Sequence, residues 1–191
     1  MRKIILTSCG IISNNLKEKF YNIIEKNVED LKLLYITTAI DGERDDNKSW
    51  VEREYKTILN LGIKESNITE YKLDYELDFN DYDAIYMMGG NTLYLLDVIR
   101  KNGMTEKIKN AINNGVIYIG SSAGSQILGN SIETAVPYNN NFVNMKDFTG
   151  LKVIDGIIIP HANKREQFIN EVKQKYDDKL YLLYDEEGIV I

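Results

Sequence analysis

Cysteine, histidine and proline are scarce in this sequence, which has one cysteine, one histidine and two prolines among 191 residues. The single cysteine, Cys9, cannot form an intrachain disulfide, which is typical of a reducing compartment, although exported bacterial proteins can also be poor in cysteine. We therefore expect a cytoplasmic protein. No stretch approaches the roughly 20 consecutive apolar residues that a membrane-spanning helix needs, so we expect no membrane partner.

Basic charge and linker-like stretches are also scarce. Lys and Arg number 23 against 29 Asp and Glu, which gives a net charge of −6, and no run of Lys and Arg alternates with aromatic residues. Such a chain lacks the basic field that attracts a phosphate backbone, so we expect no nucleic-acid partner. Without a Pro-rich, Ser-rich or low-complexity stretch to mark a linker, the length predicts one domain over residues 1–191.

What the sequence does contain is a regular alternation of short apolar runs and amphipathic stripes. Apolar residues from Leu16 to Ile24, for example, recur at helical spacing. The apolar runs predict strands at residues 3–8, 31–38, 68–73, 84–88, 116–120, 153–159, 180–184 and 188–191. Strands that alternate with helices form a mostly parallel sheet covered on both faces. The sequence therefore predicts an α/β fold, a three-layer sandwich with a mostly parallel central sheet.

One segment between a predicted strand and a predicted helix has the pattern G-x-S-x-G. Gly120-Ser121-Ser122-Ala123-Gly124 matches it only when Ser122 is the central serine. This pattern forms a tight, strained turn that exposes the serine hydroxyl at the carboxyl end of a sheet. The N–H group of Ala123 begins the helix expected over residues 123–128, where it can stabilise an oxyanion. The pattern alone also fits a phosphate-binding turn, but its position favours a serine nucleophile.

A serine nucleophile needs a general base, and His161 is the only histidine of the chain. It follows the predicted strand 153–159 and Pro160 directly. We therefore expect His161 at the same edge of the sheet as Ser122. An exposed loop histidine is the alternative, which the position after a strand makes less favourable.

The acid that orients the imidazole is left open by the sequence. Asp155 lies six residues before His161, about 20 Å away along an extended strand, and is therefore excluded. Asp185, Glu186 and Glu187 follow the predicted strand 180–184 and return to the correct edge. At least two of these three acids belong to a solvated turn.

Another glycine-rich turn, Gly89-Gly90-Asn91-Thr92, follows a predicted strand and opens a predicted helix with Asn91 as its N-cap. Its N–H groups can supply a second oxyanion donor. The same turn also fits a helix cap without any role in catalysis.

These segments together resemble peptidase family S51, which includes aspartyl dipeptidase and cyanophycinase, on a class I glutamine amidotransferase-like fold of flavodoxin-like topology. The resemblance rests on Gly-Gly-Asn-Thr at 89–92, Gly-Ser-Ser-Ala-Gly at 120–124 and Pro-His at 160–161. It implies Ser122 as nucleophile, His161 as base, and oxyanion donors at Gly90 and Ala123. For the acid, Asp185 fits best, and a one-residue slip gives Glu186.

The function that we expect is a serine peptidase, a dipeptidase or exopeptidase that acts on small peptides and needs no metal or organic cofactor. The resemblance suggests substrates with an acidic N-terminal residue. Asn91 and Arg165 are the expected substrate-binding residues, with Lys164 as a second cation near the site. We expect a monomer or a homodimer.

Three other functions stay open at this point. The same fold can serve as a non-catalytic or regulatory binding module. A flavodoxin-like nucleotide or phosphate binder is less favoured, because the chain has neither a Walker A lysine nor a full G-x-G-x-x-G pattern. A cysteine-dependent amidotransferase is less favoured still, because Cys9 lies at the exit of the first strand and not in the G-x-S-x-G turn.

Overall fold

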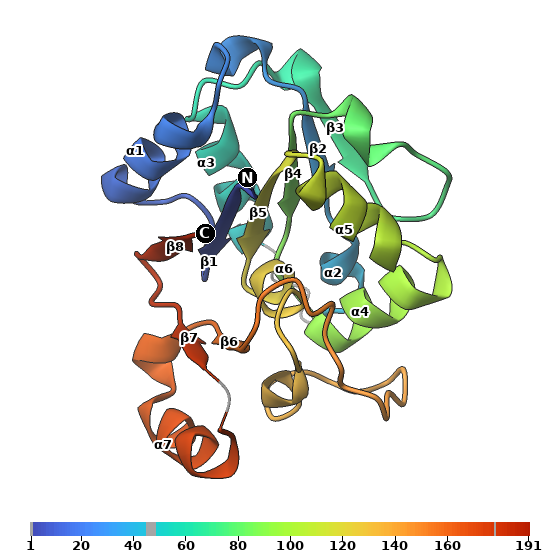
Figure 1. The fold of residues 1–191 in the computed structure, drawn as a ribbon, viewed down its shortest axis with the longest axis vertical. Coiled ribbons are helices and arrows are strands. Elements are labelled where there is room, and N and C mark those ends of the chain that lie inside the picture. The colour runs from blue at the N-terminus through green and yellow to red at the C-terminus, as the bar shows by residue number, and fades with distance from the viewer. Residues whose placement is uncertain (1, 45–48, 178) are drawn as a thin grey trace.

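The computed structural model describes residues 2–44, 49–177 and 179–191 (Figure 1). Within these ranges the strands are β1 (Ile4–Thr7), β2 (Leu33–Ile36), β3 (Ile68–Tyr71), β4 (Ala84–Met87), β5 (Ile117–Ser121), β6 (Ile157–Ile159), β7 (Leu180–Leu182) and β8 (Gly188–Val190). The α-helices there are α1 (Asn14–Ile23), α2 (Thr38–Asp41), α3 (Ser49–Leu59), α4 (Thr92–Lys101), α5 (Thr105–Asn113), α6 (Ala123–Gln126) and α7 (Glu166–Lys175). None of the helices in the described residues is long and apolar enough to cross a bilayer.

Six of the strands form one central sheet in the order β3-β2-β4-β5-β1-β8. All neighbours pair in parallel except β8, which runs antiparallel to β1. The mostly parallel α/β sheet predicted from the sequence is therefore confirmed. Because parallel strands end at one edge, the pairing of Thr7 with Ser121 brings the loops after β1 and β5 together.

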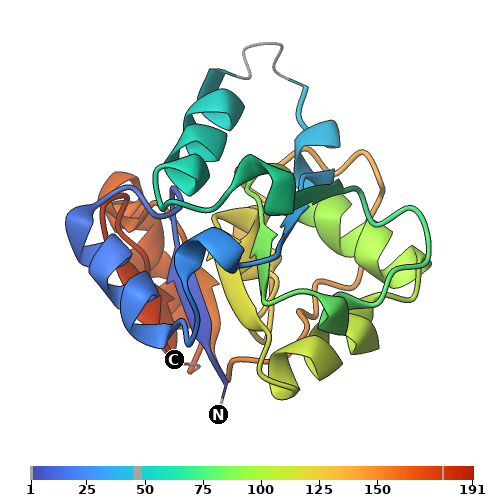
Figure 2. The same cartoon turned by 90° about the horizontal axis from the view of Figure 1, so that it is seen from above.

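The two faces of this sheet are covered by different helices, as Figure 2 shows from above. Alternate residues of each strand point to opposite faces. Ile5 and Tyr35 pack on one face with apolar residues of α1 and α3. Leu6 and Ile36 pack on the other face with residues of α4, α5 and α6. This is the three-layer arrangement that the alternating pattern predicts.

The segment after α6 departs from the sequence prediction. The strand predicted at 153–159 is only Ile157–Ile159, and it pairs in parallel with β7 in a separate two-stranded sheet. The N–H groups of Val153 and Ile154 instead donate to the carbonyl of Leu128. Gly156, with φ of 142°, then redirects the chain into β6. In Figure 1 this pair and α7, in orange and red, lie beyond the carboxyl ends of the central strands.

Candidate active site

Ser122 joins β5 to α6 with a strained backbone, at φ of 45° and ψ of −105°. Its N–H group donates to the carbonyl of Thr7, at 2.9 Å. A Cβ on Gly120 would lie 2.7 Å from the backbone nitrogen of Ser125, and one on Gly124 would overlap the carbonyl oxygen of Met87. Both outer positions of the G-x-S-x-G pattern therefore require glycine, and the surrounding sheet holds the serine in its strained turn.

The helix after Ser122 is shorter than predicted. It ends at Gln126 and not near Leu128, because the N–H groups of Leu128 and Gly129 donate to carbonyls three residues back and not four. One turn of helix has little macrodipole. Stabilisation of negative charge near Ser122 therefore depends on individual N–H groups, such as that of Ala123.

His161 reaches Ser122 from the small sheet. Its Nε2 atom lies 3.1 Å from the Ser122 Oγ atom. The prediction that both residues share one edge of the central sheet is wrong in detail, because β6, which precedes His161, pairs only with β7 in the described residues. The histidine backbone is left-handed, with φ of 57°. Ser8 holds it in place, because the Ser8 hydroxyl accepts from the His161 N–H group (2.8 Å) and donates to the carbonyl of Leu183 (2.7 Å).

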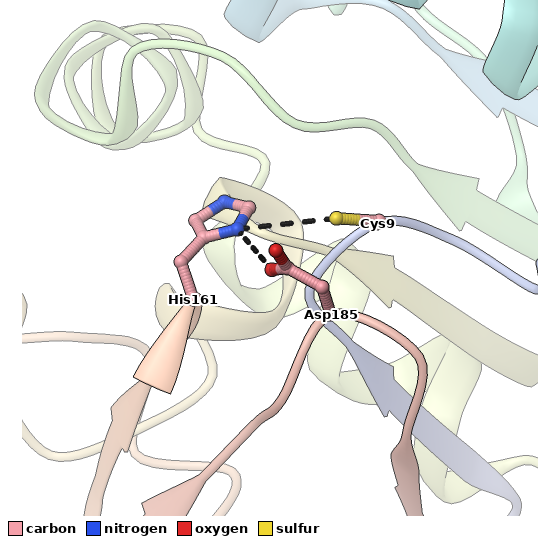
Figure 3. A group of neighbouring side chains, drawn as sticks. All are labelled: Cys9, His161 and Asp185. Atoms are coloured by element: carbon pink, nitrogen blue, oxygen red, sulfur yellow. Dashed lines mark hydrogen bonds and ion pairs between the residues drawn. The ribbon is translucent and has the colours of Figure 1, made fainter. Parts of the chain in front are cut away.

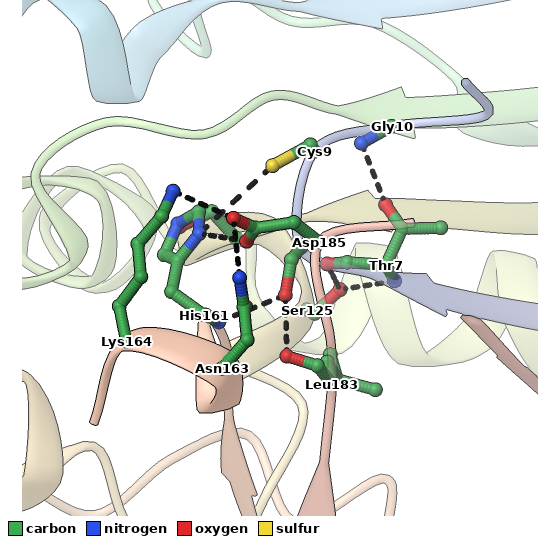
Figure 4. Close-up of polar contacts among 11 residues, drawn as sticks. Thr7, Cys9, Gly10, Ser125, His161, Asn163, Lys164, Leu183 and Asp185 are labelled. Carbon is green, nitrogen blue, oxygen red and sulfur yellow. Dashed lines mark hydrogen bonds and ion pairs between the residues drawn. The ribbon is translucent and has the colours of Figure 1, made fainter. Parts of the chain in front are cut away.

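Asp185 is the acid that the structure brings to the imidazole. Its Oδ1 atom lies 2.7 Å from His161 Nδ1, and its Oδ2 atom accepts hydrogen bonds from Asn163 (3.1 Å) and Lys164 (2.6 Å) (Figure 4). Glu186 is exposed to solvent. Of the acids that the sequence left open, Asp185 therefore occupies the position next to His161. Lys164 is bound to this carboxylate, and so it does not serve as a second free cation.

The electrostatics of this group suit proton transfer. Burial lowers the pKa of His161, an effect that its hydrogen bond to Asp185 partly offsets. Burial alone would raise the pKa of Asp185, but hydrogen bonds from Lys164, His161 and Asn163 hold it well below its ordinary value. Near neutral pH the imidazole is therefore neutral and the carboxylate ionised. Such an imidazole can accept a proton from the Ser122 hydroxyl.

Cys9 is a neighbour that sequence reasoning missed. Its Sγ atom lies 3.9 Å from His161 Nδ1 (Figure 3), whereas Ser122 Oγ faces the other ring nitrogen, Nε2. Burial, followed by the nearby Asp185 carboxylate, raises the pKa of the Cys9 thiol to about 12. A neutral thiol is a poor nucleophile, which disfavours the cysteine-dependent alternative. Only the fold could reveal this contact, since 152 residues separate Cys9 from His161.

The Ser122 hydroxyl and His161 line a cavity of about 650 Å³. Gly90 and Arg165, both predicted from the sequence, also line it. Other lining residues carried no recognisable signal in the sequence: Cys9, Ile12, Glu43, Trp50, Arg53, Glu54, Thr57, Tyr138 and Asn139. The guanidinium of Arg165 lies 3.7 Å from the centre of the Tyr138 ring, which fixes a half-buried cation at the cavity wall.

The Gly-Gly-Asn-Thr turn contributes backbone to the cavity but not the predicted asparagine side chain. Gly90 has φ of 134°, and a Cβ there would overlap the carbonyl of Ala39. Asn91 caps α4 by accepting from the N–H group of Tyr94, as the sequence predicts. Its side-chain amide also donates to the carbonyls of Gly42 and Asn140. Because these polar groups are all engaged within the protein, we correct the predicted substrate-binding role of Asn91. Its side chain instead holds the neighbouring loops in place.

The same turn is a poor phosphate cradle. The N–H group of Asn91 donates to Ala39, and that of Thr92 donates to the Asn139 side chain at 2.8 Å. Two of the four N–H groups in the turn are thus bound to the protein. This disfavours the nucleotide- or phosphate-binding alternative.

The serine turn, the Gly-Gly-Asn-Thr turn and the histidine that meets the serine all lie within one family match. Residues 4–191 match the model of peptidase family S51. The chain belongs to this family. It is therefore a peptidase of a serine hydrolase family.

Individual relatives agree with this membership. An uncharacterized peptidase of Listeria monocytogenes, Lmo0363, is 28% identical over 176 residues, which are 87% of this chain and 85% of that protein. Peptidase E of Shewanella sp. strain ANA-3 is 36% identical over 81 residues, 42% of this chain and 34% of the relative. A crystal structure of a candidate peptidase E from Listeria monocytogenes matches with a TM-score of 0.81 and 25% identity, and the match covers 100% of this chain and 94% of that one.

Proposed function

We propose that this S51 peptidase is a serine exopeptidase that hydrolyses small peptides through Ser122, His161 and Asp185. The observation that carries the proposal is the continuous chain of contacts from the Ser122 hydroxyl through the imidazole to the Asp185 carboxylate, at 3.1 and 2.7 Å. The chain of contacts opens on a cavity whose volume is within the range of small-molecule sites.

In the proposed mechanism, Ser122 Oγ attacks the carbonyl carbon of the scissile peptide bond. His161 Nε2 takes the hydroxyl proton and then gives it to the leaving amine, so that an acyl-enzyme remains. A water molecule, with its proton taken by the same nitrogen, releases the product acid and restores Ser122. Asp185 accepts the hydrogen bond of Nδ1–H, which keeps Nε2 free to act as the base.

Gly90 and Ala123 are the proposed oxyanion donors. Gly90 lines the cavity, and the preceding Gly89 approaches Ser122 so closely that a Cβ on it would lie 3.2 Å from the serine Cβ. Ala123 directly follows the nucleophile in the first turn of α6. Neither donor is a side chain, so their contribution depends on the rigid backbone of the two turns.

The most specific part of the proposal is a preference for substrates with an acidic N-terminal residue. Arg165 supports it, because the guanidinium is half-buried at the cavity wall and is held in place by Tyr138. Planar guanidinium groups bind carboxylates through two parallel hydrogen bonds. Arg165→Met should therefore raise KM for Asp-X dipeptides far more than for Ala-X dipeptides.

A fluorophosphonate probe tests the nucleophile directly. Wild-type protein should be labelled at one site, and Ser122→Ala should not be labelled. Ser121→Ala, which removes the neighbouring hydroxyl, is the matched control and should still be labelled. Equal labelling of wild type and Ser122→Ala would show that Ser122 is not the nucleophile. Absence of labelling in the wild type would favour the non-catalytic binding module.

A panel of dipeptides tests the reaction. Asp-X, Glu-X and Ala-X, each with a free and an acetylated amine, are offered to wild type, Ser122→Ala and His161→Ala. We expect cleavage of the free forms only, and at least about 10⁴-fold lower kcat in both variants. Efficient cleavage of acetylated peptides would overturn the exopeptidase assignment.

A further inference from the structure

Three side chains that can each bind a metal ion, a thiol, an imidazole and a carboxylate, meet at the Nδ1 side of His161. Cys9 follows β1, His161 follows β6 and Asp185 follows β7. Their ligand atoms, the cysteine Sγ, the histidine Nδ1 and a carboxylate oxygen, all lie within 4.8 Å of one another. Figure 3 shows both side chains directed at Nδ1 and away from Nε2, the nitrogen that faces Ser122.

The spacing is close to that of a tetrahedral metal site. With Zn–S near 2.3 Å and bonds to nitrogen and oxygen near 2.05 Å, tetrahedral ligands lie about 3.6 Å apart for S···N and about 3.3 Å for N···O. Here Sγ and Nδ1 are 3.9 Å apart, and Nδ1 and Asp185 Oδ1 are 2.7 Å apart. The first distance must shorten by about 0.3 Å and the second must lengthen by about 0.6 Å to fit the ion. The Cys9 Sγ atom, now within 4.8 Å of the Asp185 oxygen, must also come to about 3.6 Å from it. The fourth position is open to solvent, because Cys9 and His161 both line the cavity.

We propose that Cys9, His161 and Asp185 bind a divalent transition-metal ion of borderline softness, Zn²⁺ or Co²⁺, and that this ion switches off the nucleophile. The inhibitory part rests on the function proposed above. A thiolate, an imidazole and a carboxylate suit these ions and not Mg²⁺ or Ca²⁺, which prefer oxygen ligands.

Charge balance and hydrogen bonding support the site. A Cys9 thiolate and the Asp185 carboxylate together neutralise the two positive charges of the ion. Asp185 Oδ2 keeps its hydrogen bond to Asn163, as ligating carboxylates usually do. Lys164 opposes the ion by charge, but its side chain is 66% exposed and free to move toward solvent.

Metal binding and catalysis use the imidazole in incompatible ways. When the ion binds, the Cys9 thiol proton is released to solvent and a Cys9–metal bond forms. The lone pair of Nδ1 binds the ion, so the single proton of the neutral imidazole must be on Nε2. A protonated Nε2 cannot accept the proton of the Ser122 hydroxyl. The Asp185 carboxylate then binds the ion and no longer accepts a hydrogen bond from Nδ1–H, so the imidazole loses the contact that orients it for catalysis.

The composition of the chain makes the binding test unambiguous. Cys9 is the only cysteine and His161 the only histidine, so in tag-free protein a thiolate–Co²⁺ charge-transfer band can arise only at Cys9. We expect this band at one ion per chain in wild type and in Ser122→Ala, which keeps all three ligands, and its loss in Cys9→Ala. Zn²⁺ affinity should fall in Cys9→Ala by more than the roughly 10- to 100-fold that loss of an outer hydrogen-bond partner causes. A wild type without the band, or Cys9→Ala that binds Zn²⁺ as tightly, would overturn the metal site.

Two further readouts test the inhibitory step. Saturating Zn²⁺, but not Mg²⁺, should slow fluorophosphonate labelling of wild type at least about tenfold, with recovery on adding a chelator. Cys9→Ala, compared with its own metal-free rate, should be unaffected at the same Zn²⁺ concentration. The ¹⁵N shifts of the single imidazole should place the ion on Nδ1 and the proton on Nε2. Labelling at an unchanged rate in metal-loaded protein, or a proton on Nδ1, would overturn the inhibitory step. A wild type with the band and these shifts but without any labelling keeps the metal site and overturns the proposed function.

Discussion

The nucleophile and its two partners come from regions of very different construction. Ser122 leaves β5, whose five residues are all buried and which lies between β4 and β1 in the six-stranded sheet. His161 and Asp185 follow β6 and β7, which form a pair of three-residue strands, and every residue of β7 is only partly buried. The comparison teaches that Ser122 is fixed by the central sheet, whereas the imidazole and carboxylate are fixed by each other and by hydrogen bonds from Ser8, Asn163 and Lys164.

Ile158 and Leu183 pack in the same apolar core as the central strands, and a few hydrogen bonds position the small sheet near the site. Ser8, directly after β1, binds both the His161 N–H group and the Leu183 carbonyl. The N–H group of Asn130, after α6, donates to the carbonyl of Gly156. The distance from Ser122 to His161 therefore depends on the junction between the sheets, while the distance from His161 to Asp185 is set within the small sheet.

The largest effect should come from the pair within the small sheet. Asp185→Asn should lower kcat for dipeptide hydrolysis by about 10⁴-fold, because an amide favours the wrong imidazole tautomer. Steady-state kinetics measure this. Glu186→Gln, one residue later and exposed, is the matched control and should change kcat by less than about twofold. A large loss in Glu186→Gln with little loss in Asp185→Asn would reverse the assignment of the acid.

The next largest effect should come from the serine turn of the central sheet. Gly124→Ala places a Cβ onto the carbonyl of Met87, so the free energy of unfolding should fall by about 3 kcal/mol. Displacement of Ser122 should also lower kcat by about 10²-fold. Urea denaturation and kinetics measure the two effects.

Gly103→Ala is the control for Gly124→Ala, because it adds backbone strain without an overlap with neighbouring atoms. Gly103 has φ of 66°, and a Cβ there would meet no atom within 4 Å. Its substitution should cost about 1 kcal/mol and leave kcat unchanged. If Gly124→Ala also costs only about 1 kcal/mol and leaves kcat unchanged, the central sheet does not hold the serine turn rigidly.

The central sheet and its serine turn were predictable because local pattern is sufficient there. A buried apolar run bounded by glycines indicates a central strand, and G-x-S-x-G places Ser122 at its end. Asn91 was also recognisable as the N-cap of α4. Each of these inferences needs only neighbouring residues and the periodicity of helices and strands.

The small sheet was not predictable, because periodicity shows that residues are buried but not what they pair with. Residues 153 and 154 continue the apolar run of β6, yet they bind Leu128. Asp185 and Glu186 differ by one position in a turn, and the family resemblance favours Asp185 without excluding Glu186. Cys9 reaches His161 across 152 positions of sequence. These contacts depend on tertiary structure alone.

A smaller effect should follow from weakening the junction between the sheets. Ser8→Ala leaves the His161 N–H group without its partner, while the Leu183 carbonyl keeps its hydrogen bond from the Ala162 N–H group. This change should lower the free energy of unfolding by about 1–3 kcal/mol. The histidine should then move relative to Ser122, and we expect a tenfold lower kcat, about 1.4 kcal/mol in the barrier. Urea denaturation and kinetics again give both values.

Ser13→Ala is the matched control for Ser8→Ala. Ser13 caps α1 by accepting from the N–H group of Leu16, so its loss should cost about 1 kcal/mol of stability without any effect on kcat. If Ser8→Ala loses stability in the same way and keeps full kcat, the junction does not position His161.

The smallest effect should be a change in the pH dependence of kcat/KM, caused by removing the charge of Lys164 next to the small sheet. Burial is the main cause of the lowered pKa of His161, and the charges of Arg165 and Lys164 lower it further. Only the neutral imidazole can accept a proton, so kcat/KM should rise with pH, and the midpoint of this rise should lie below the ordinary histidine pKa of about 6.5. Lys164→Met removes one of these charges, so the acidic limb of the profile should move to higher pH.

This shift can be read from the protein itself as well as from its kinetics. Because His161 is the only histidine, NMR titration of its imidazole in buffer with a chelator gives its pKa without assignment of other signals. Lys17→Met, a lysine of α1, is the control and should leave the titration in place. Lys164 contacts Asp185 and not His161 in the structure, so a shift in the imidazole titration would show that the charge acts at a distance or through the carboxylate. An acidic limb that moves to lower pH would contradict the assigned effect of the Lys164 charge. A limb that stays in place would mean that the Lys164 charge does not affect the pKa, and that the small sheet tunes its histidine by packing and not by this charge.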